Sequence, residues 1–187
     1  MKLNLLFVLF IGISLLMTLS CTEDEAPTGA ENTIAFTFDA DLDGWVPGIA
    51  GGGLDAVRWI DWGGQPEGAV EMDGSDFGTS DGQANAWIYQ EIELPGDATT
   101  LKFQTSTHDR DGANAHLRVR LVDAGGVSHT LIDWEVGEPG VEGQLVWIDK
   151  SVSIAAYAGQ TVTIFFEQGD NDIGFHEQRY LDNIVIE

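Results

Sequence analysis

The chain carries few positive charges and a single cysteine. Its 187 residues include 31 Asp and Glu but only 8 Lys and Arg, which gives a formal net charge of −23. Such a surface repels nucleic acid and anionic polymers, and it favours cations and neutral ligands. Because Cys21 is the only cysteine, no disulfide can form within the chain. We therefore expect a fold that depends on a hydrophobic core, and a function without nucleic acid.

Long apolar runs are also scarce, and the exception lies at the start of the chain. Residues 3–19 are almost entirely hydrophobic and follow Lys2, which is typical of a secretory signal and short for a membrane span. The run Leu19-Ser20-Cys21 resembles a bacterial lipobox. That resemblance implies a lipoprotein signal peptide over residues 1–20, cleavage before Cys21 and a lipid anchor on Cys21. An ordinary cleaved signal is the alternative.

An acidic polar segment separates this leader from the rest of the chain. Residues 21–32 contain Thr22-Glu23-Asp24-Glu25, Pro27 and Gly29, a composition typical of a linker. The acidic run resembles the surface-export signal of Bacteroidetes-type lipoproteins, which implies an exported protein anchored to the outer membrane and exposed at the cell surface. A solvated tether is the alternative. Residues 33–187 are enough for one domain with a sizeable core.

Helical periodicity is missing from this domain, whereas short alternating runs are frequent. In Leu117-Arg118-Val119-Arg120-Leu121 the apolar residues share one face and both arginines the other. Segments rich in Gly, Asp, Asn and Pro separate such runs. The pattern predicts an all-β fold, a two-sheet antiparallel β-sandwich with Greek-key connections. The expected strands cover residues 33–38, 56–60, 67–72, 86–94, 99–107, 115–123, 128–134, 145–154, 160–168 and 179–186.

Alternation also predicts which side chains fill the core. Trp45 and Trp87 belong to patterned strands and are expected inside. The other expected core residues are Phe36, Phe38, Ile88, Ile92, Leu101, Phe103, Leu117, Val119, Leu121, Ile164, Phe166 and Ile184.

Five segments in order along the domain carry a likeness to a known family: Phe36–Trp45, Trp87–Leu94, Leu117–Gly126, Tyr157–Phe166 and Tyr180–Ile186. Their layout resembles a jelly-roll domain of the galactose-binding-like group, which includes many carbohydrate-binding modules of secreted glycosidases. The resemblance implies non-catalytic sugar binding and a structural Ca²⁺ near Asp182, with Asp39 and its neighbours as partners. Because the sugar site varies among such families, no binding residue transfers by position.

The first of these segments also contains a cluster of acids. Asp39, Asp41, Asp43 and Gly44 match the first half of an EF-hand calcium loop, but Ala50 stands where the loop needs its final Glu. An EF-hand is therefore excluded. Because clustered carboxylates repel one another unless they are neutralised, we expect Asp39, Asp41, Asp43 and Asp182 to share a Ca²⁺. An acidic solvated turn is the alternative.

Three other tryptophans occur where strands meet loops. Trp59 and Trp62 flank Asp61 at the entry to a Gly-rich loop, and Trp134 ends a strand. A flat apolar ring beside polar groups is what a neutral sugar needs, so Trp59, Trp62, Trp134 and Asp61 are candidate ligand contacts. The alternative is that these rings cap the ends of the sandwich.

Two charged pairs remain. Arg118 and Arg120 are candidate ligand contacts that can bind an acidic group in bidentate fashion; the alternative is that they neutralise acidic neighbours across the sheet. Glu91 and Glu93 share one side of a strand, and a glycosidase uses a pair of acids, but no third acid follows in the pattern of jelly-roll enzymes. We therefore do not expect an enzyme.

Together these features predict a lipid-anchored, exported, non-catalytic module with a structural Ca²⁺ that binds a neutral polysaccharide or oligosaccharide. The first alternative is a cell-surface adhesion or assembly module that binds protein partners. The second is a small glycan-active hydrolase.

Overall fold

The computed structural model describes residues 32–49, 57–73, 84–107, 116–135, 144–169 and 178–187. The chain divides into Met1–Ala30 and a second unit, Glu31–Glu187, which holds all of the described residues. The expected signal peptide, most of the linker and the lipidation site Cys21 lie outside the described residues. Among those that are described, no helix has the length and apolar character needed to span a membrane.

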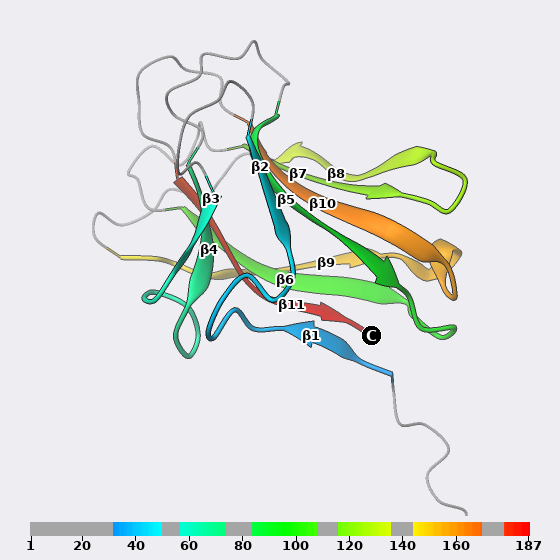
Figure 1. The fold of residues 1–187 in the computed structure, drawn as a ribbon, viewed down its shortest axis with the longest axis horizontal. Coiled ribbons are helices and arrows are strands. Elements are labelled where there is room, and N and C mark those ends of the chain that lie inside the picture. Colours follow the sequence, from blue (N-terminus) through cyan, green and yellow to red (C-terminus); the bar gives the residue numbers. More distant parts are fainter. Residues whose placement is uncertain (1–31, 50–56, 74–83, 108–115, 136–143, 170–177) are drawn as a thin grey trace, which may run out of the picture. The chain divides into compact units, whose positions relative to one another are not determined.

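Two antiparallel sheets face each other, as predicted (Figure 1). Sheet A has the order β3 (Val57–Ile60), β4 (Ala69–Asp73), β11 (Gln178–Ile186), β6 (Thr100–Thr107) and β9 (Ile148–Ser153), and β1 (Ile34–Phe36) also pairs with β11. Sheet B has the order β2 (Val46–Ile49), β5 (Ala84–Glu93), β10 (Thr161–Gly169), β7 (His116–Val122) and β8 (Ser128–Glu135). A short 3₁₀ helix, η1 (Ala155–Tyr157), precedes β10. The predicted two-sheet antiparallel β-sandwich is confirmed.

The core lies between the sheets, where aromatic rings from both layers meet. Phe103 of β6 contacts Phe166 of β10 edge to face, with ring centroids 4.9 Å apart. Trp45 packs against the same Phe166 ring at 5.5 Å and is 2% exposed. All of the other expected core residues except Phe36 are buried, and Phe36 is half-buried against them.

The prediction that Trp87 lies in the core is wrong. Ile88 of β5 is fully buried between the sheets, and successive side chains of a strand point to opposite faces. Trp87 therefore lies on the outer face of sheet B, where it is half-buried.

Strand β2 was not expected from the sequence. It contains Pro47 and Gly48, which are poor strand formers. Proline is tolerated at the edge of a sheet because one side of an edge strand needs no hydrogen-bond donor. β2 is an edge strand that pairs only with β5 among the described strands, from Val46 opposite Tyr89 to Ile49 opposite Ala86.

The two ends of the domain are paired. Ile34 lies opposite Ile186, and Phe36 lies opposite Ile184. The backbone of Glu187 also exchanges hydrogen bonds with Thr100. The entry and exit of this unit are therefore side by side, both on sheet A (Figure 1).

Candidate functional site

Aromatic and charged side chains gather on the outer face of sheet B. In β10, Val162, Ile164 and Phe166 are buried between the sheets, so Phe165 and Glu167 point to the opposite face. Phe165 pairs with Tyr89 and Arg120 on its two sides, and Glu167 pairs with Trp87 and Arg118. We call this face the platform; its residues are Trp87, Tyr89, Arg118, Arg120, Trp134, Phe165 and Glu167.

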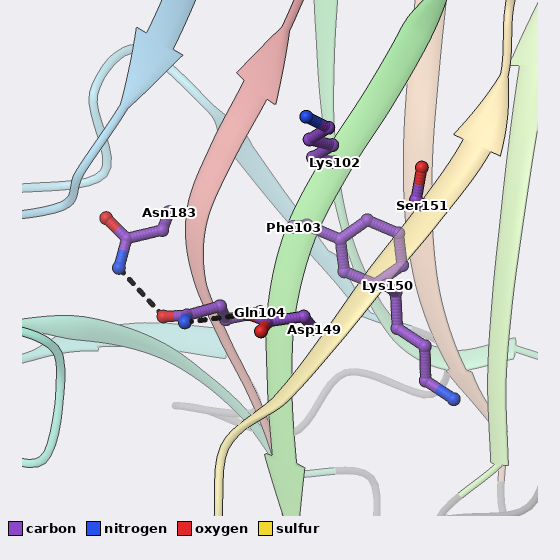
Figure 2. A pocket seen from close by; sticks show the side chains of 7 residues that line it. All are labelled: Lys102, Phe103, Gln104, Asp149, Lys150, Ser151 and Asn183. Atoms are coloured by element: carbon purple, nitrogen blue, oxygen red, sulfur yellow. Dashed lines mark hydrogen bonds between the residues drawn. The ribbon is translucent and has the colours of Figure 1, made fainter.

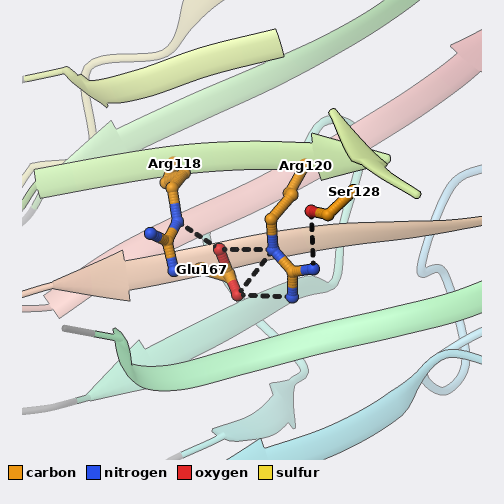
Figure 3. A network of polar contacts seen from close by, with 4 residues as sticks. All are labelled: Arg118, Arg120, Ser128 and Glu167. Carbon is orange, nitrogen blue, oxygen red and sulfur yellow. Dashed lines mark hydrogen bonds and ion pairs between the residues drawn. The ribbon is translucent and has the colours of Figure 1, made fainter. Parts of the chain in front are cut away.

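Glu167 holds the polar centre of the platform (Figure 3). Its Oε2 accepts a hydrogen bond from Arg118 Nε at 2.5 Å, and its Oε1 accepts one from Arg120 Nη2 at 3.0 Å. Arg120 Nη1 also donates to Ser128 Oγ at 3.1 Å. The Glu167 side chain is 5% exposed and both arginines are 23% exposed. One carboxylate thus fixes two cations, as the interpretation that these arginines neutralise an acid across the sheet predicted.

The aromatic rings are ordered by the same residues. Tyr89 and Phe165 stack with ring centroids 5.3 Å apart and an interplanar angle of 21°. Arg120 Cζ lies 4.2 Å from the Phe165 centroid, and Arg118 Cζ lies 4.2 Å from the Trp134 centroid. A cation over an aromatic face attracts the ring electrons. Each arginine therefore holds one aromatic ring in place in addition to binding Glu167. The platform offers flat apolar faces beside guanidinium and carboxylate groups.

Trp59, Trp62 and Asp61 lie elsewhere, at the end of β3 in sheet A and in the loop that follows. Trp59 is half-buried against the core, and its Nε1 donates to the carbonyl of Phe38 at 2.6 Å. Trp62 is 48% exposed, with its ring centroid 6.1 Å from that of Tyr180. The structure therefore places Trp134, Arg118 and Arg120 on one surface and the other three candidates on another.

The loop of residues 61–68 is tied down at several points. Trp147 Nε1 donates to the carbonyl of Gly63 at 2.7 Å, and Asn183 Nδ2 donates to the carbonyl of Gln65 at 3.0 Å. The loop also folds closely on itself, because a side chain at Gly64 would place its Cβ 1.5 Å from the Gly68 carbonyl oxygen. This packing lays the loop over Asp182 of β11.

Three of the four candidate metal ligands, Asp41, Asp43 and Asp182, accept hydrogen bonds from backbone amides, and Asp39 Oδ2 accepts one from Thr37 Oγ1 at 3.0 Å. Asp43 Oδ2 accepts hydrogen bonds from the N–H groups of Thr37 and Phe38, each at 2.8 Å. Asp41 Oδ1 accepts one from the Asp43 N–H at 2.7 Å. Across the described part of the chain, no group of three His, Cys, Asp or Glu side chains is arranged to hold a metal ion.

Asp182 is nevertheless in an unusual electrostatic setting. Its side chain is fully buried, and its two oxygens accept hydrogen bonds from the N–H groups of Gln65 and Asn183, each at 2.7 Å. Burial raises the pKa of Asp182 to about 6, those two hydrogen bonds oppose the rise, and the charges of Asp39 and Asp43 add to it. A cation beside Asp39, Asp43 and Asp182 would offset the repulsion between their negative charges.

A separate pocket of about 380 Å³ opens over β6 and β9 (Figure 2). Asn183 Nδ2 donates to Gln104 Oε1 at 2.9 Å, and Gln104 Nε2 donates to Asp149 Oδ1 at 2.9 Å. These two hydrogen bonds join two side-chain amides and one carboxylate in the lining of the pocket. Its lining residues are Lys102, Phe103, Gln104, Asp149, Lys150, Ser151 and Asn183.

Sequence reasoning missed Trp87, Tyr89, Phe165 and Glu167 as surface residues. The signal that could have found them is the alternation itself: once Ile88 and Phe166 are assigned to the core, their neighbours must face outward. The pairing of β5 with β10, which brings these four residues together, joins segments about eighty residues apart and cannot be read from local pattern.

No protein-family model matches the chain, and no curated protein matches its sequence. Solved structures do match. The K1 cleaved adhesin domain of Lys-gingipain from Porphyromonas gingivalis W83 is 19% identical, with a TM-score of 0.60 over 83% of this chain and 97% of that one. The mannan-recognising carbohydrate-binding module TmCBM27 is 16% identical, with a TM-score of 0.56 over 82% and 96%.

A third match is the CBM22-1 xylan-binding domain of Xyn10C from Paenibacillus barcinonensis. It is 13% identical, with a TM-score of 0.54 over 82% of this chain and 92% of that one. These likenesses establish the class of fold: the chain has the β-sandwich seen in carbohydrate-binding modules and in gingipain adhesin domains. The sequence predicts a fold like that of carbohydrate-binding jelly rolls, and these matches confirm that prediction.

Proposed function

We propose that this protein is a non-catalytic glycan-binding module and that the platform is its binding surface. The observation that carries the proposal is the arrangement on one sheet face of two indole rings, a stacked Tyr89–Phe165 pair and two arginines fixed by Glu167. Sugar rings present apolar C–H faces that pack on aromatic rings, and hydroxyls that bond to fixed polar groups. The fold shared with mannan- and xylan-binding modules supports the same reading.

We propose further that the glycan is neutral. The chain has a net charge of −23, which disfavours the approach of an acidic polymer. Both arginines of the platform already share the Glu167 carboxylate, so this cluster keeps a net charge of only +1 within a strongly acidic chain. Guanidinium N–H groups that are held in place can donate to sugar hydroxyls without requiring an anionic partner.

The platform is better suited to binding than to hydrolysis. A glycosidase uses two carboxyl groups on either side of the bond that it cleaves. Glu167 is engaged by two arginines, and Glu91 and Glu93 are exposed at the far end of β5.

Trp62, with Asp61 beside it, remains a candidate for a secondary sugar contact because its ring is exposed. Trp59 is the weaker candidate, since its N–H and much of its ring are engaged.

We also propose that a structural Ca²⁺ binds beside Asp182. Asp182, Asp39 and Asp43 would hold the ion with carboxylate oxygens, which Ca²⁺ prefers, and Asp41 would orient Asp43 through its backbone N–H. The charges of Asp39 and Asp43, which add to the raised pKa of Asp182, support this assignment. The ion would neutralise the cluster and link the entry of the domain to its last strand.

The final part of the proposal concerns location. The lipobox-like Leu19-Ser20-Cys21 and the acidic run that follows support export, lipid attachment at Cys21 and anchoring in the outer membrane, with the domain exposed on the cell surface. Labelled palmitate should be incorporated into the wild-type protein in cells and lost in Cys21→Ser. Incorporation into Cys21→Ser would overturn the anchor.

Affinity electrophoresis of the Cys21→Ser chain through gels containing soluble mannan, xylan or galactan tests the binding function. Retention by at least one polysaccharide should fall about tenfold or more in Trp87→Ala and in Trp134→Ala. Val146→Ala, which changes an exposed apolar residue outside the platform, is the control. Unchanged retention of both platform variants would reject the platform. Absence of retention together with capture of a surface protein would favour the adhesion module, the alternative that the gingipain likeness keeps open.

A further inference from the structure

Each tryptophan of the platform rests against a glycine of another strand. Gly48 of β2 lies directly opposite Trp87 of β5. A Cβ atom at Gly48 would lie 2.0 Å from Trp87 Nε1 and 2.3 Å from Cε2. The indole ring therefore occupies the space where any other residue at position 48 would carry its side chain. Trp87 leans over the edge strand with its ring against the backbone of β2.

Trp134 has the same relationship with Gly169 of β10. A Cβ atom at Gly169 would lie 2.5 Å from Trp134 Cζ3 and 3.0 Å from Cε3. Because β7 separates β8 from β10 in sheet B, the Trp134 ring reaches across a whole strand to meet this glycine. Arg118 of that intervening strand contacts the ring, with Cζ 4.2 Å from its centroid.

The backbone of Trp134 is bent to make this reach. Leu117 pairs with Glu135 and Val119 pairs with Ile132, so three steps along β8 match two steps along β7. Such a β-bulge redirects a side chain. Trp134 also has φ 39°, a left-handed conformation that is rare for a non-glycine residue and that concentrates at functional sites.

The two glycines define the spacing of the rings. Gly48 lies in β2 and Gly169 lies in β10, and β5 runs between these two strands. Trp87 of β5 is paired with Gly48 on one side and with Glu167 on the other, and Glu167 is two residues before Gly169. Two strand spacings across and two residues along correspond to roughly 12 Å between the glycines. A ligand that packs on both rings must be longer than one sugar.

We propose that Gly48 and Gly169 are positioning residues that hold Trp87 and Trp134 flat against sheet B, and that the two rings together select an oligosaccharide chain over a single sugar. The inference rests on the proposed glycan-binding function. Any side chain at either glycine would tilt its ring away from the sheet and remove one of the two stacking faces. A purely structural role for the glycines would instead affect stability without a selective effect on binding.

The test compares Gly48→Ala and Gly169→Ala with Trp87→Ala and Trp134→Ala in the Cys21→Ser chain. Gly96→Ala is the matched control, since a Cβ at Gly96 meets no atom within 4 Å. We expect each glycine variant to lose at least tenfold in affinity for the polysaccharide that retains the wild type, and to alter the near-ultraviolet circular dichroism of its indole. The double variant Gly48→Ala/Trp87→Ala should bind no more weakly than Trp87→Ala alone.

Replacing the ring provides a rescue that a structural role does not predict. Trp87→Phe in the Gly48→Ala background should recover part of the lost affinity, because a smaller ring fits beside the new methyl group. Glycine variants that bind like Gly96→Ala, while both tryptophan variants lose binding, would overturn the positioning role and leave the binding function intact. Tryptophan variants that bind like the wild type would overturn both.

Ligand length gives the second readout. Wild-type affinity should rise at least tenfold from disaccharide to hexasaccharide of the retained glycan. Gly169→Ala and Trp134→Ala should flatten this rise, since a chain would then contact only one ring. Equal affinity of the wild type for disaccharide and hexasaccharide would overturn the selection of chains.

Discussion

Arg120 approaches Glu167 with the side of its guanidinium group, placing Nη2 3.0 Å from Oε1 and Nε 3.3 Å from the same oxygen. Arg120 Nε also lies 3.4 Å from Oε2, the oxygen that accepts the hydrogen bond from Arg118 Nε. Both carboxylate oxygens are therefore held by guanidinium donors. The carboxylate is nearly buried, whereas the two guanidinium groups retain some contact with solvent. Glu167 therefore acts as the fixed anion around which the platform is arranged.

Glu167→Gln should lower the free energy of unfolding by about 2 kcal/mol, because two partly buried cations lose their shared countercharge. Glycan retention should fall as well, since Arg118 and Arg120 would no longer be held against the Trp134 and Phe165 rings. Urea unfolding and affinity electrophoresis measure the two effects. Glu91→Gln, an exposed acid on the same face, serves as the control. Equal unfolding midpoints of the two variants would contradict this role of Glu167.

Acidification should stabilise the metal-free protein through Asp182. The pKa of this carboxyl is about 6 in the folded state, above its ordinary value of 3.8, so the folded state binds the proton more tightly than the unfolded state. Stability from this group is lost as the pH rises from about 4 to about 6. Between pH 7 and pH 5 the gain is about 1 kcal/mol.

Urea unfolding at both pH values, in the presence of chelator, measures that gain. Other acids also repel one another less at pH 5, so Asp182→Asn supplies the reference slope. A wild-type change between pH 7 and pH 5 that is no larger than the change in Asp182→Asn would contradict the assignment.

Calcium should reverse this pH dependence. An ion beside Asp182 favours the ionised carboxylate, so Ca²⁺ should raise the melting temperature at pH 7 and have less effect at pH 5. Calorimetry with millimolar Ca²⁺ and with chelator provides the measurement, and Asp182→Ala should remove the difference. Equal melting of the wild type under both conditions would exclude the structural ion.

The two tryptophans around Asp61 should respond differently to truncation. Trp59→Ala should cost about 3 kcal/mol because it removes a ring packed on the core and leaves the Phe38 carbonyl without its donor. Trp62→Ala should cost less than about 1 kcal/mol, since half of its ring is exposed. Chemical unfolding of the pair tests this order, and a larger loss in Trp62→Ala would mean that the loop of residues 61–68 depends on that ring.

The class of fold could be predicted because the strands alternate clearly. Arg118 and Arg120 were placed on the outer face from the pattern Leu117-Arg118-Val119-Arg120-Leu121 alone, and the burial of Val119 agrees. Trp87 was placed inside because large aromatic residues in patterned strands are usually buried. Its neighbour Ile88 is also expected in the core, and two adjacent residues of one strand cannot both point inward.

The binding surface was harder to predict because it depends on strand order and backbone irregularity. Glu167 becomes a partner of both arginines only when β10 lies beside β7. Trp134 reaches the platform because of a β-bulge and a positive φ. Residue preferences along β8 do not predict either feature. Trp59 and Trp62 were grouped with it on the basis of residue type, whereas the chain carries them to the other sheet.

The pairing of β1 with β11 determines how the domain can be attached to something larger. Both ends leave from sheet A, while the platform lies on the outer face of sheet B. A tether before Asn32 or a fusion after Glu187 would therefore be joined on the side of the sandwich away from the platform. The same adjacency makes the domain suitable for circular permutation, with Glu187 linked to Asn32 by a short connector and new ends opened elsewhere in the chain.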